Sequence, residues 1–211
     1  MSGDDAGSAT PAAEERELRL HVKAELRRRM RAIRRAMPAD ARSLRSDALC
    51  ERVLGLEAFR DARVIAAFLA IRAEVDVARV VDRARELGKR VVMPRVDDVQ
   101  RALVMHVCSP GDALAESSFG VAEPLESAAR IEASDIDLVL VPALAVDERG
   151  HRIGYGQGYY DRFLPTATRA TRVCVAFDFQ MVSEVPDMPG DRGVDVVVTD
   201  KRVITIGRRV P

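Results

Sequence analysis

A glycine-rich segment at residues 154–161 has the composition of a phosphate-binding loop. It reads GYGQGYYD, with glycine at positions 154, 156 and 158, and it follows a strongly apolar run. Glycine adopts backbone conformations that other residues avoid, and it lets a bulky anion approach the backbone N–H groups. A helix that begins near Tyr159 would point its free N–H groups and its positive end at the same place. The segment therefore predicts a polyphosphate site.

This segment matches neither of the two common nucleotide motifs. The P-loop ends in Gly-Lys-Ser/Thr, and the dinucleotide fingerprint has a different glycine spacing and opens a helix directly from a strand. Three alternating glycines alone are more often an ordinary surface turn. The residues around them must therefore decide between a turn and a binding site.

Two helices are expected before the first strand. Apolar residues recur at helical spacing over residues 14–37, with arginines on the other faces. Pro38 ends this helix, and Asp40 can cap a second one that runs to about residue 59. Residues 1–13 show no basic region followed by an apolar one, so we interpret them as a disordered leader before a single domain at residues 14–211.

The rest of the chain alternates strands and helices. An apolar run at residues 63–70, a helical pattern at 74–87 and a second run at 90–96 predict a crossover unit with parallel strands. The most apolar run, 137–147, is expected in the middle of the sheet, buried on both faces. Residues 109–136 are expected to be rich in loops. Further strands are predicted at 102–108, 171–179, 194–200 and, as a last edge strand, 202–207.

This order predicts an α/β fold, a three-layer α/β/α sandwich with a mostly parallel, Rossmann-like central sheet. In such a fold the nucleotide lies at the carboxyl ends of the strands. The 211 residues suffice for one sizeable domain. The fold thus places the glycine segment, which follows the central strand, at the binding edge of the sheet.

Composition limits the partners of the chain. The 33 Lys and Arg residues balance the 33 Asp and Glu residues, so no global field attracts nucleic acid or an anionic membrane. No apolar stretch reaches the length of a membrane span. The three cysteines form no CxxC pair, which favours buried thiols in a reducing compartment. We expect a cytoplasmic monomer that binds small molecules and neither nucleic acid nor a membrane.

The segment GYGQGYYDRFL, preceded by VPALAVDERGHRI, resembles the signature of the 5-formyltetrahydrofolate cyclo-ligase family. Shorter matches follow in family order: KAELR at 23–27, FLAIRAEVD around Glu74, MPRV at 93–96, FGVAEP at 119–124 and VDVVVTD at 194–200. The resemblance implies conversion of 5-formyltetrahydrofolate and ATP to 5,10-methenyltetrahydrofolate, ADP and phosphate, with Mg²⁺ as cofactor. The formyl oxygen would take the γ-phosphoryl group, and the neighbouring amine nitrogen would then attack the activated carbon.

The resemblance also implies a phosphate clamp. Lys23 and Arg27 lie one turn apart on the first helix and would reach the phosphates from one side, with Arg152 and the glycine segment on the other. The same two residues also fit a solvated basic helix face. The expected ATP-binding residues are Lys23, Arg27, Arg152, Gly154, Gly156, Gln157, Gly158 and Tyr159.

Further roles are implied for the metal and the folate. Mg²⁺ takes one or two protein carboxylates, and Asp161 and Asp195 are the ones assigned to it. Tyr160 and Asp161 are the expected catalytic residues. Leu69, Glu74 and Tyr160 are the expected substrate-binding residues, with Glu74 at the start of the helix after the first strand, although a glutamate there is also a common cap residue.

Two positions depart from the usual family pattern. Gly190 stands where many members have His, and Gln157 stands where Gly or Lys is frequent. Gly190 can alter how the last loop lies over the nucleotide, and Gln157 removes a possible cationic contact. We expect lower ATP affinity with activity retained.

Three other functions compete with this interpretation. A non-catalytic folate-binding or regulatory protein would keep the folate pocket without consuming ATP. A related ATP-using enzyme could act on a different small acceptor, because the fold and loop specify the nucleotide more firmly than the acceptor. RNA binding through the arginine-rich first helix is disfavoured by the balanced charge and the lack of aromatic stacking motifs.

Overall fold

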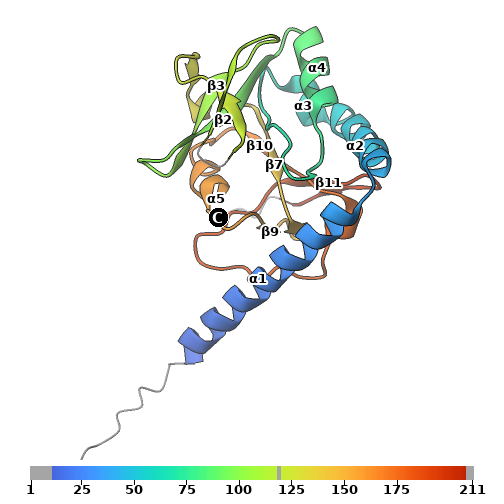
Figure 1. Cartoon of the computed structure of the whole chain (residues 1–211), viewed down its shortest axis with the longest axis vertical. Coiled ribbons are helices and arrows are strands. Elements are labelled where there is room, and N and C mark those ends of the chain that lie inside the picture. Colours follow the sequence, from blue (N-terminus) through green and yellow to red (C-terminus); the bar gives the residue numbers. More distant parts are fainter. Residues whose placement is uncertain (1–10, 118–119, 208–211) are drawn as a thin grey trace, which may run out of the picture.

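The computed structural model describes residues 11–117 and 120–207 and is built around an eight-stranded sheet (Figure 1). The strand order is β12-β11-β10-β7-β1-β2-β3-β6. Neighbouring strands from β11 to β2 pair in parallel, whereas β12, β3 and β6 each pair antiparallel at the two edges. The strands are β1 (Val64–Ala66), β2 (Arg90–Asp97), β3 (Ala102–Val107), β6 (Arg130–Ile131), β7 (Leu138–Pro142), β10 (Thr171–Val175), β11 (Val196–Val198) and β12 (Val203–Thr205).

Strand β7 lies in the middle of the sheet and is buried on both faces, as the sequence predicts. Leu138 and Leu140 enter one hydrophobic core, and Val139 and Val141 enter the other. This alternation follows from the two-residue repeat of a strand. A continuous apolar run is thus what a strand with helices or loops on both sides requires.

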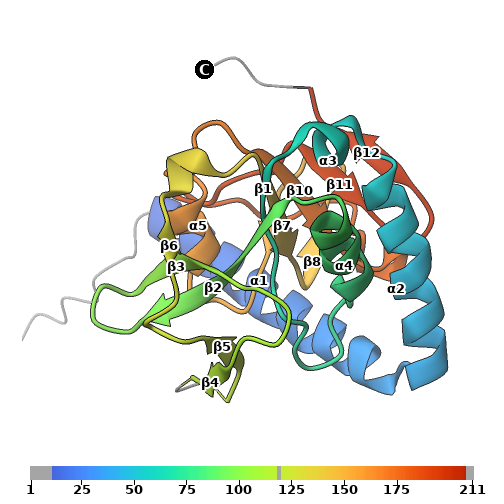
Figure 2. The same ribbon diagram turned by 90° about the horizontal axis from the view of Figure 1, so that it is seen from above.

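Helices cover both faces of the sheet, which confirms the three-layer prediction (Figure 2). On one face α2 (Ala39–Leu54), α3 (Glu57–Asp61) and α4 (Ala78–Glu86) contribute residues such as Leu49, Phe59 and Val80 to the first core. On the other face α5 (Tyr159–Phe163) contributes Phe163. The long helix α1 (Pro11–Ala36) packs against β8 (Ala145–Val146), and its amino-terminal half projects from the body in Figure 1.

Several element boundaries differ from the predicted ones. Helix α1 begins at Pro11, inside the expected leader, whose first ten residues lie outside the described residues. The second helix is interrupted after Leu54, so its end is the separate α3. Helix α4 begins at Ala78 rather than at 74. Val77 is its N-cap, and in the turn just before the helix Asp76 Oδ1 accepts a hydrogen bond from the Ala78 N–H at 2.9 Å.

The expected loop-rich excursion contains short strands. Residues 109–136 include the hairpin of β4 (Leu114–Glu116) and β5 (Ala122–Pro124), the edge strand β6 and the 3₁₀ turn η1 (Ala133–Asp135). A second hairpin, β8 with β9 (Arg152–Ile153), directly precedes the glycine segment, and another 3₁₀ turn, η2 (Asp178–Gln180), follows β10. The predicted edge strand after residue 201 is present as β12.

The cysteines are buried thiols, as expected. Cys50, Cys108 and Cys174 are unpaired, and burial raises the pKa of Cys50 to about 11 and that of Cys174 to about 12. A thiol with a raised pKa is a poor nucleophile at neutral pH. Among the helices that the structure describes, none is long and apolar enough to cross a membrane.

Candidate active site

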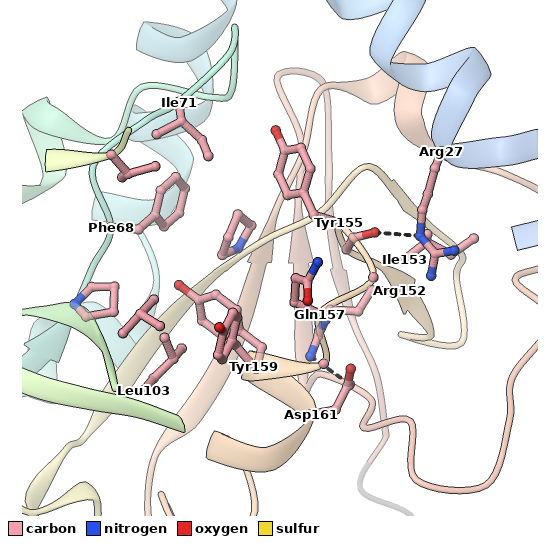
Figure 3. A pocket seen from close by; sticks show the side chains of 18 of the residues that line it. Arg27, Phe68, Ile71, Leu103, Arg152, Ile153, Tyr155, Gln157, Tyr159 and Asp161 are labelled. Carbon is pink, nitrogen blue, oxygen red and sulfur yellow. Dashed lines mark hydrogen bonds and ion pairs between the residues drawn. The ribbon is translucent and has the colours of Figure 1, made fainter. Parts of the chain in front are cut away.

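A cavity of about 590 Å³ opens where the carboxyl ends of β1, β2 and β7 meet α1 and the glycine segment. Its two ends differ in chemistry. One end is lined by charged side chains and by the glycine segment, the other by apolar side chains from the loop after β1 and from β2 and β3 (Figure 3). The cavity can therefore hold an anionic group and a flat apolar group side by side.

The glycine segment forms a wall of the cavity, as the sequence predicts. Gly156 and Gly158 have φ values of +101° and +69°, in the region that favours glycine, whereas Gly154 does not have a positive φ. A Cβ on Gly156 would also lie 3.5 Å from the Arg27 guanidinium. Gly158 directly precedes α5, which begins at Tyr159 as predicted. Glycine is thus favoured at 156 by its backbone conformation, since a 3.5 Å contact with the Arg27 side chain is itself an ordinary van der Waals distance.

Lys23 and Arg27 face the cavity, not the solvent. Lys23 is 5% exposed and forms an ion pair with Asp191. Arg27 Nε donates to the Gly154 carbonyl at 3.0 Å, and desolvation lowers the pKa of Arg27. The interpretation of these residues as a solvated basic face is therefore wrong. Arg31, one further turn along α1, also lines the cavity.

Arg152 and Asp161 form the second charged pair of the cavity. Arg152 Nη2 lies 3.0 Å from Asp161 Oδ1, and the Arg152 side chain is only 3% exposed. The Asp161 oxygen also accepts the Arg192 N–H at 3.2 Å. The Arg152 guanidinium lies 5.7 Å from the centroid of the Tyr160 ring. A buried arginine with one carboxylate and one aromatic ring is oriented for recognition of a planar or phosphate anion.

Tyr159, Tyr160 and Gln157 also line the cavity. Burial raises the pKa of Tyr160, so its phenol stays neutral at physiological pH. A neutral phenol donates a hydrogen bond or packs against a ligand, and it does not act as a base. Tyr159 lies under the Arg162 guanidinium, 5.2 Å from the ring centroid.

Of the two remaining residues predicted to bind the substrate, one lies at the apolar end of the cavity. Leu69 lines it, but Glu74 does not. Glu74 lies in the turn before α4, not at the start of the helix as expected, and it is buried behind the wall with Oε2 accepting the Ile71 N–H at 3.1 Å. Burial raises the pKa of Glu74. The apolar lining residues beside Leu69 include Phe68, Ile71, Met93, Pro94, Val96 and Leu103.

Asp195 is not brought to the cavity. It precedes β11 and is held at the amino ends of β10 and β11, where its carboxylate accepts the Arg172 N–H at 2.8 Å. The cavity lies at the opposite, carboxyl ends of the parallel strands. Asp191, four residues earlier, lines the cavity instead and pairs with Lys23. The assignment of Asp195 as a metal ligand is therefore wrong on geometric grounds.

The cavity residues that the sequence did not single out include Arg31, Asp191 and Tyr155. Arg31 continues the Lys23 and Arg27 spacing by one turn, and that spacing is a signal for it. Asp191 lies in a loop where Gly190 has φ +97°, so the departure at 190 supplies a conformation that other residues rarely adopt. Tyr155, between two glycines, lines the cavity with a burial-raised pKa.

Comparisons with known proteins identify the family of the chain. A sequence model of the 5-formyltetrahydrofolate cyclo-ligase family matches residues 19–200. The chain is similar to the 5-formyltetrahydrofolate cyclo-ligase of Mycolicibacterium smegmatis, at 32% identity over 86% of this chain and 95% of the relative, and to that of Mus musculus, at 27% identity over 84% and 91%.

A solved structure shares the fold as well. The NMR structure of Aquifex aeolicus 5,10-methenyltetrahydrofolate synthetase superposes with a TM-score of 0.78 and 30% sequence identity, covering 90% of this chain and 96% of that one. The family match spans all the strands from β1 to β11 and every charged residue of the cavity. The chain belongs to the 5-formyltetrahydrofolate cyclo-ligase family.

Proposed function

We propose that this protein converts 5-formyltetrahydrofolate and ATP to 5,10-methenyltetrahydrofolate, ADP and phosphate, with Mg²⁺ bound alongside the nucleotide. The observation that supports this most directly is the single cavity that joins a cationic, glycine-walled end to an apolar end. The reaction requires a triphosphate and a folate to meet within one site. Family membership supports the folate as the acceptor.

The cationic end fits a triphosphate. Arg27, with its main-chain hydrogen bond to Gly154, would hold the phosphates from the α1 side, and Arg152 would hold them from the β9 side. Phosphoryl transfer needs little covalent chemistry from the protein, so positioning and charge neutralisation account for most of the catalysis. Opposed cations with backbone N–H groups between them provide both.

The carboxylates of this end fit Mg²⁺. Asp161 and Asp191 both line the cavity, and each is paired with a cation. Phosphate oxygens could take the place of the carboxylate beside that cation and so free the carboxylate to bind Mg²⁺. The described residues contain no group of three or more His, Cys, Asp or Glu that could hold a metal by themselves. Mg²⁺ commonly takes one or two carboxylates and completes its shell with water and phosphate oxygens. When bound, the ion would neutralise charge on the phosphates.

The chemical steps follow from the two ligands. The formyl oxygen attacks the γ-phosphorus, the bond from this phosphorus to ADP breaks, and the formyl carbon becomes activated. The neighbouring amine nitrogen then bonds to this carbon and loses its proton, and phosphate leaves with the former formyl oxygen. The neutral Tyr160 phenol, beside Arg152, would act through a hydrogen bond or packing, not as the base.

Isotope tracing tests these steps. With ¹⁸O in the formyl group, we expect the label in the released inorganic phosphate, with one ADP formed per methenyl product. Label that stays in the folate or passes to water would contradict phosphorylation of the formyl oxygen. Release of ADP without any methenyl product, whatever the folate concentration, would favour the related enzyme with a different acceptor.

The two aspartates near the last strands should behave differently. Asp191→Asn removes the charge that faces Lys23, and we expect the KM for Mg-ATP to rise about tenfold, as for loss of one charged contact worth about 1.4 kcal/mol. Asp195→Asn keeps an oxygen that can accept the Arg172 N–H, so its KM should stay within about twofold of wild type. Steady-state kinetics at varied Mg-ATP measures both. The reverse order would restore Asp195 as the ligand.

A further inference from the structure

A buried arginine at the end of α1 contacts two segments that wall different parts of the cavity. Arg34 is 1% exposed, and its Nη2 donates to the Tyr155 hydroxyl at 2.7 Å and to the Arg72 carbonyl at 2.9 Å. Its Nη1 lies 3.9 Å from Glu74 Oε1. Tyr155 belongs to the glycine segment, and Arg72 and Glu74 belong to the loop after β1. One guanidinium therefore connects the phosphate end of the cavity with the apolar end.

The loop after β1 depends on its surroundings for its shape. Arg72 and Ala73 have φ values of +47° and +65°, two consecutive left-handed residues that are not glycine. The turn is closed by the Glu74 N–H to the Ile71 carbonyl (2.9 Å) and by Glu74 Oε2 with the Ile71 N–H. Such a conformation persists only where neighbouring groups hold it. Arg34 donates a hydrogen bond to the Arg72 carbonyl of this turn and supplies the counter-charge to buried Glu74.

The glycine segment depends on the same contact. Tyr155 has glycine on both sides, so its side chain anchors a stretch that otherwise lacks one. The Tyr155 ring lies 5.8 Å from the Arg34 guanidinium and 6.0 Å from that of Arg72. In Figure 3 this ring extends from the glycine segment toward Ile71, which belongs to the other wall. Loss of the Arg34 hydrogen bond would remove a buried link between the two walls and leave only the contacts of Tyr155 with Arg72 and Glu74 to hold them together.

We propose that Arg34 is a positioning residue that holds the nucleotide end and the folate end of the cavity in register through Tyr155 and the turn at residues 71–74. The inference rests on the proposed function, because register matters when two bound ligands must react with each other. A misplacement of about 1 Å between reacting groups can cost on the order of 10² in rate. Arg34 itself does not line the cavity, so it would act through its neighbours.

A double-mutant cycle tests this role. We expect Arg34→Met to lower kcat about 100-fold and Tyr155→Phe about tenfold, with each KM within about fivefold of wild type. Because both substitutions remove the same contact, the double variant should be no slower than Arg34→Met alone. Arg35→Met is the matched control, since Arg35 is the next residue of α1 and is exposed, and its kcat should equal that of wild type.

The outcomes separate positioning from simple stability. Thermal unfolding and the stoichiometry of bound nucleotide give the folded fraction, and kcat is taken per folded molecule. If Arg34→Met does not fold, Tyr155→Phe decides alone, and an unchanged kcat would overturn the inference. The inference would also be overturned if the two substitutions lowered kcat multiplicatively in the double variant, provided that wild type and Arg35→Met are active. An inactive wild type would instead overturn the proposed function itself.

Discussion

Replacing Asp161 with Asn is expected to lower kcat/KM by at least about 10³-fold, because a carboxylate that faces the triphosphate with its cation is worth several kcal/mol in such sites. Asp161 Oδ1 accepts both Arg152 Nη2 and the Arg192 N–H. Asparagine keeps the shape and one acceptor oxygen, so the pocket should persist while the negative charge is lost. The loss should therefore fall mainly on kcat and on the response to Mg²⁺.

The measurement is steady-state turnover at several Mg²⁺ concentrations. Asp82→Asn on α4 is the control, since the Asp82 side chain is 69% exposed and does not line the cavity. Its turnover should equal that of wild type. If Asp161→Asn kept kcat and its dependence on Mg²⁺, Asp161 would serve only to hold Arg152 in place.

Replacing Arg152 with Met should have an effect of similar size. Methionine preserves much of the buried volume but removes the group that contacts Asp161 and the Tyr160 ring. An arginine that stabilises transferring phosphate charge is worth roughly 10³ or more in kcat. Arg152→Lys keeps the charge without the planar fork, and we expect it to recover only about tenfold of the lost rate.

Two readouts make this prediction specific. At saturating folate, Arg152→Met should lower kcat and not only raise the KM for ATP. The reason is that the contact of Arg152 with the phosphate strengthens as charge develops in the transition state. Arg83→Met, on the exposed side of α4 with a side chain that is 51% exposed, is the control and should be neutral. A variant with normal kcat and raised KM would reduce Arg152 to ordinary ground-state binding of ATP.

The sheet could be predicted from the sequence because a buried strand requires a recognisable run of apolar residues. Between Asp137 and Asp147 the run is apolar without interruption, and β7 is indeed covered on both faces. The glycine segment was equally informative, because positive φ at Gly156 and Gly158 restricts the residue type. Lys23 and Arg27 lie one helical turn apart, so the helical repeat places both on the same face of α1, and both line the cavity.

The errors come from contacts that periodicity does not encode. Glu74 begins a helical pattern in the sequence, but a turn in which Asp76 accepts the Ala78 N–H precedes α4, which starts at Ala78 and leaves Glu74 in a buried turn. For Asp195 a usable rule existed: a residue just before a strand of a parallel sheet lies at the amino edge, away from the binding edge. Asp191 and Tyr155 gain their places only from distant partners, Lys23 and Arg34.

The most direct test of the central claim follows the ultraviolet absorbance of the methenyl product after the purified protein is mixed with 5-formyltetrahydrofolate and Mg-ATP. We expect the absorbance to grow only when folate, ATP and Mg²⁺ are all present. Binding of 5-formyltetrahydrofolate with no product at any Mg-ATP concentration would contradict the account and would identify the protein as a non-catalytic folate binder.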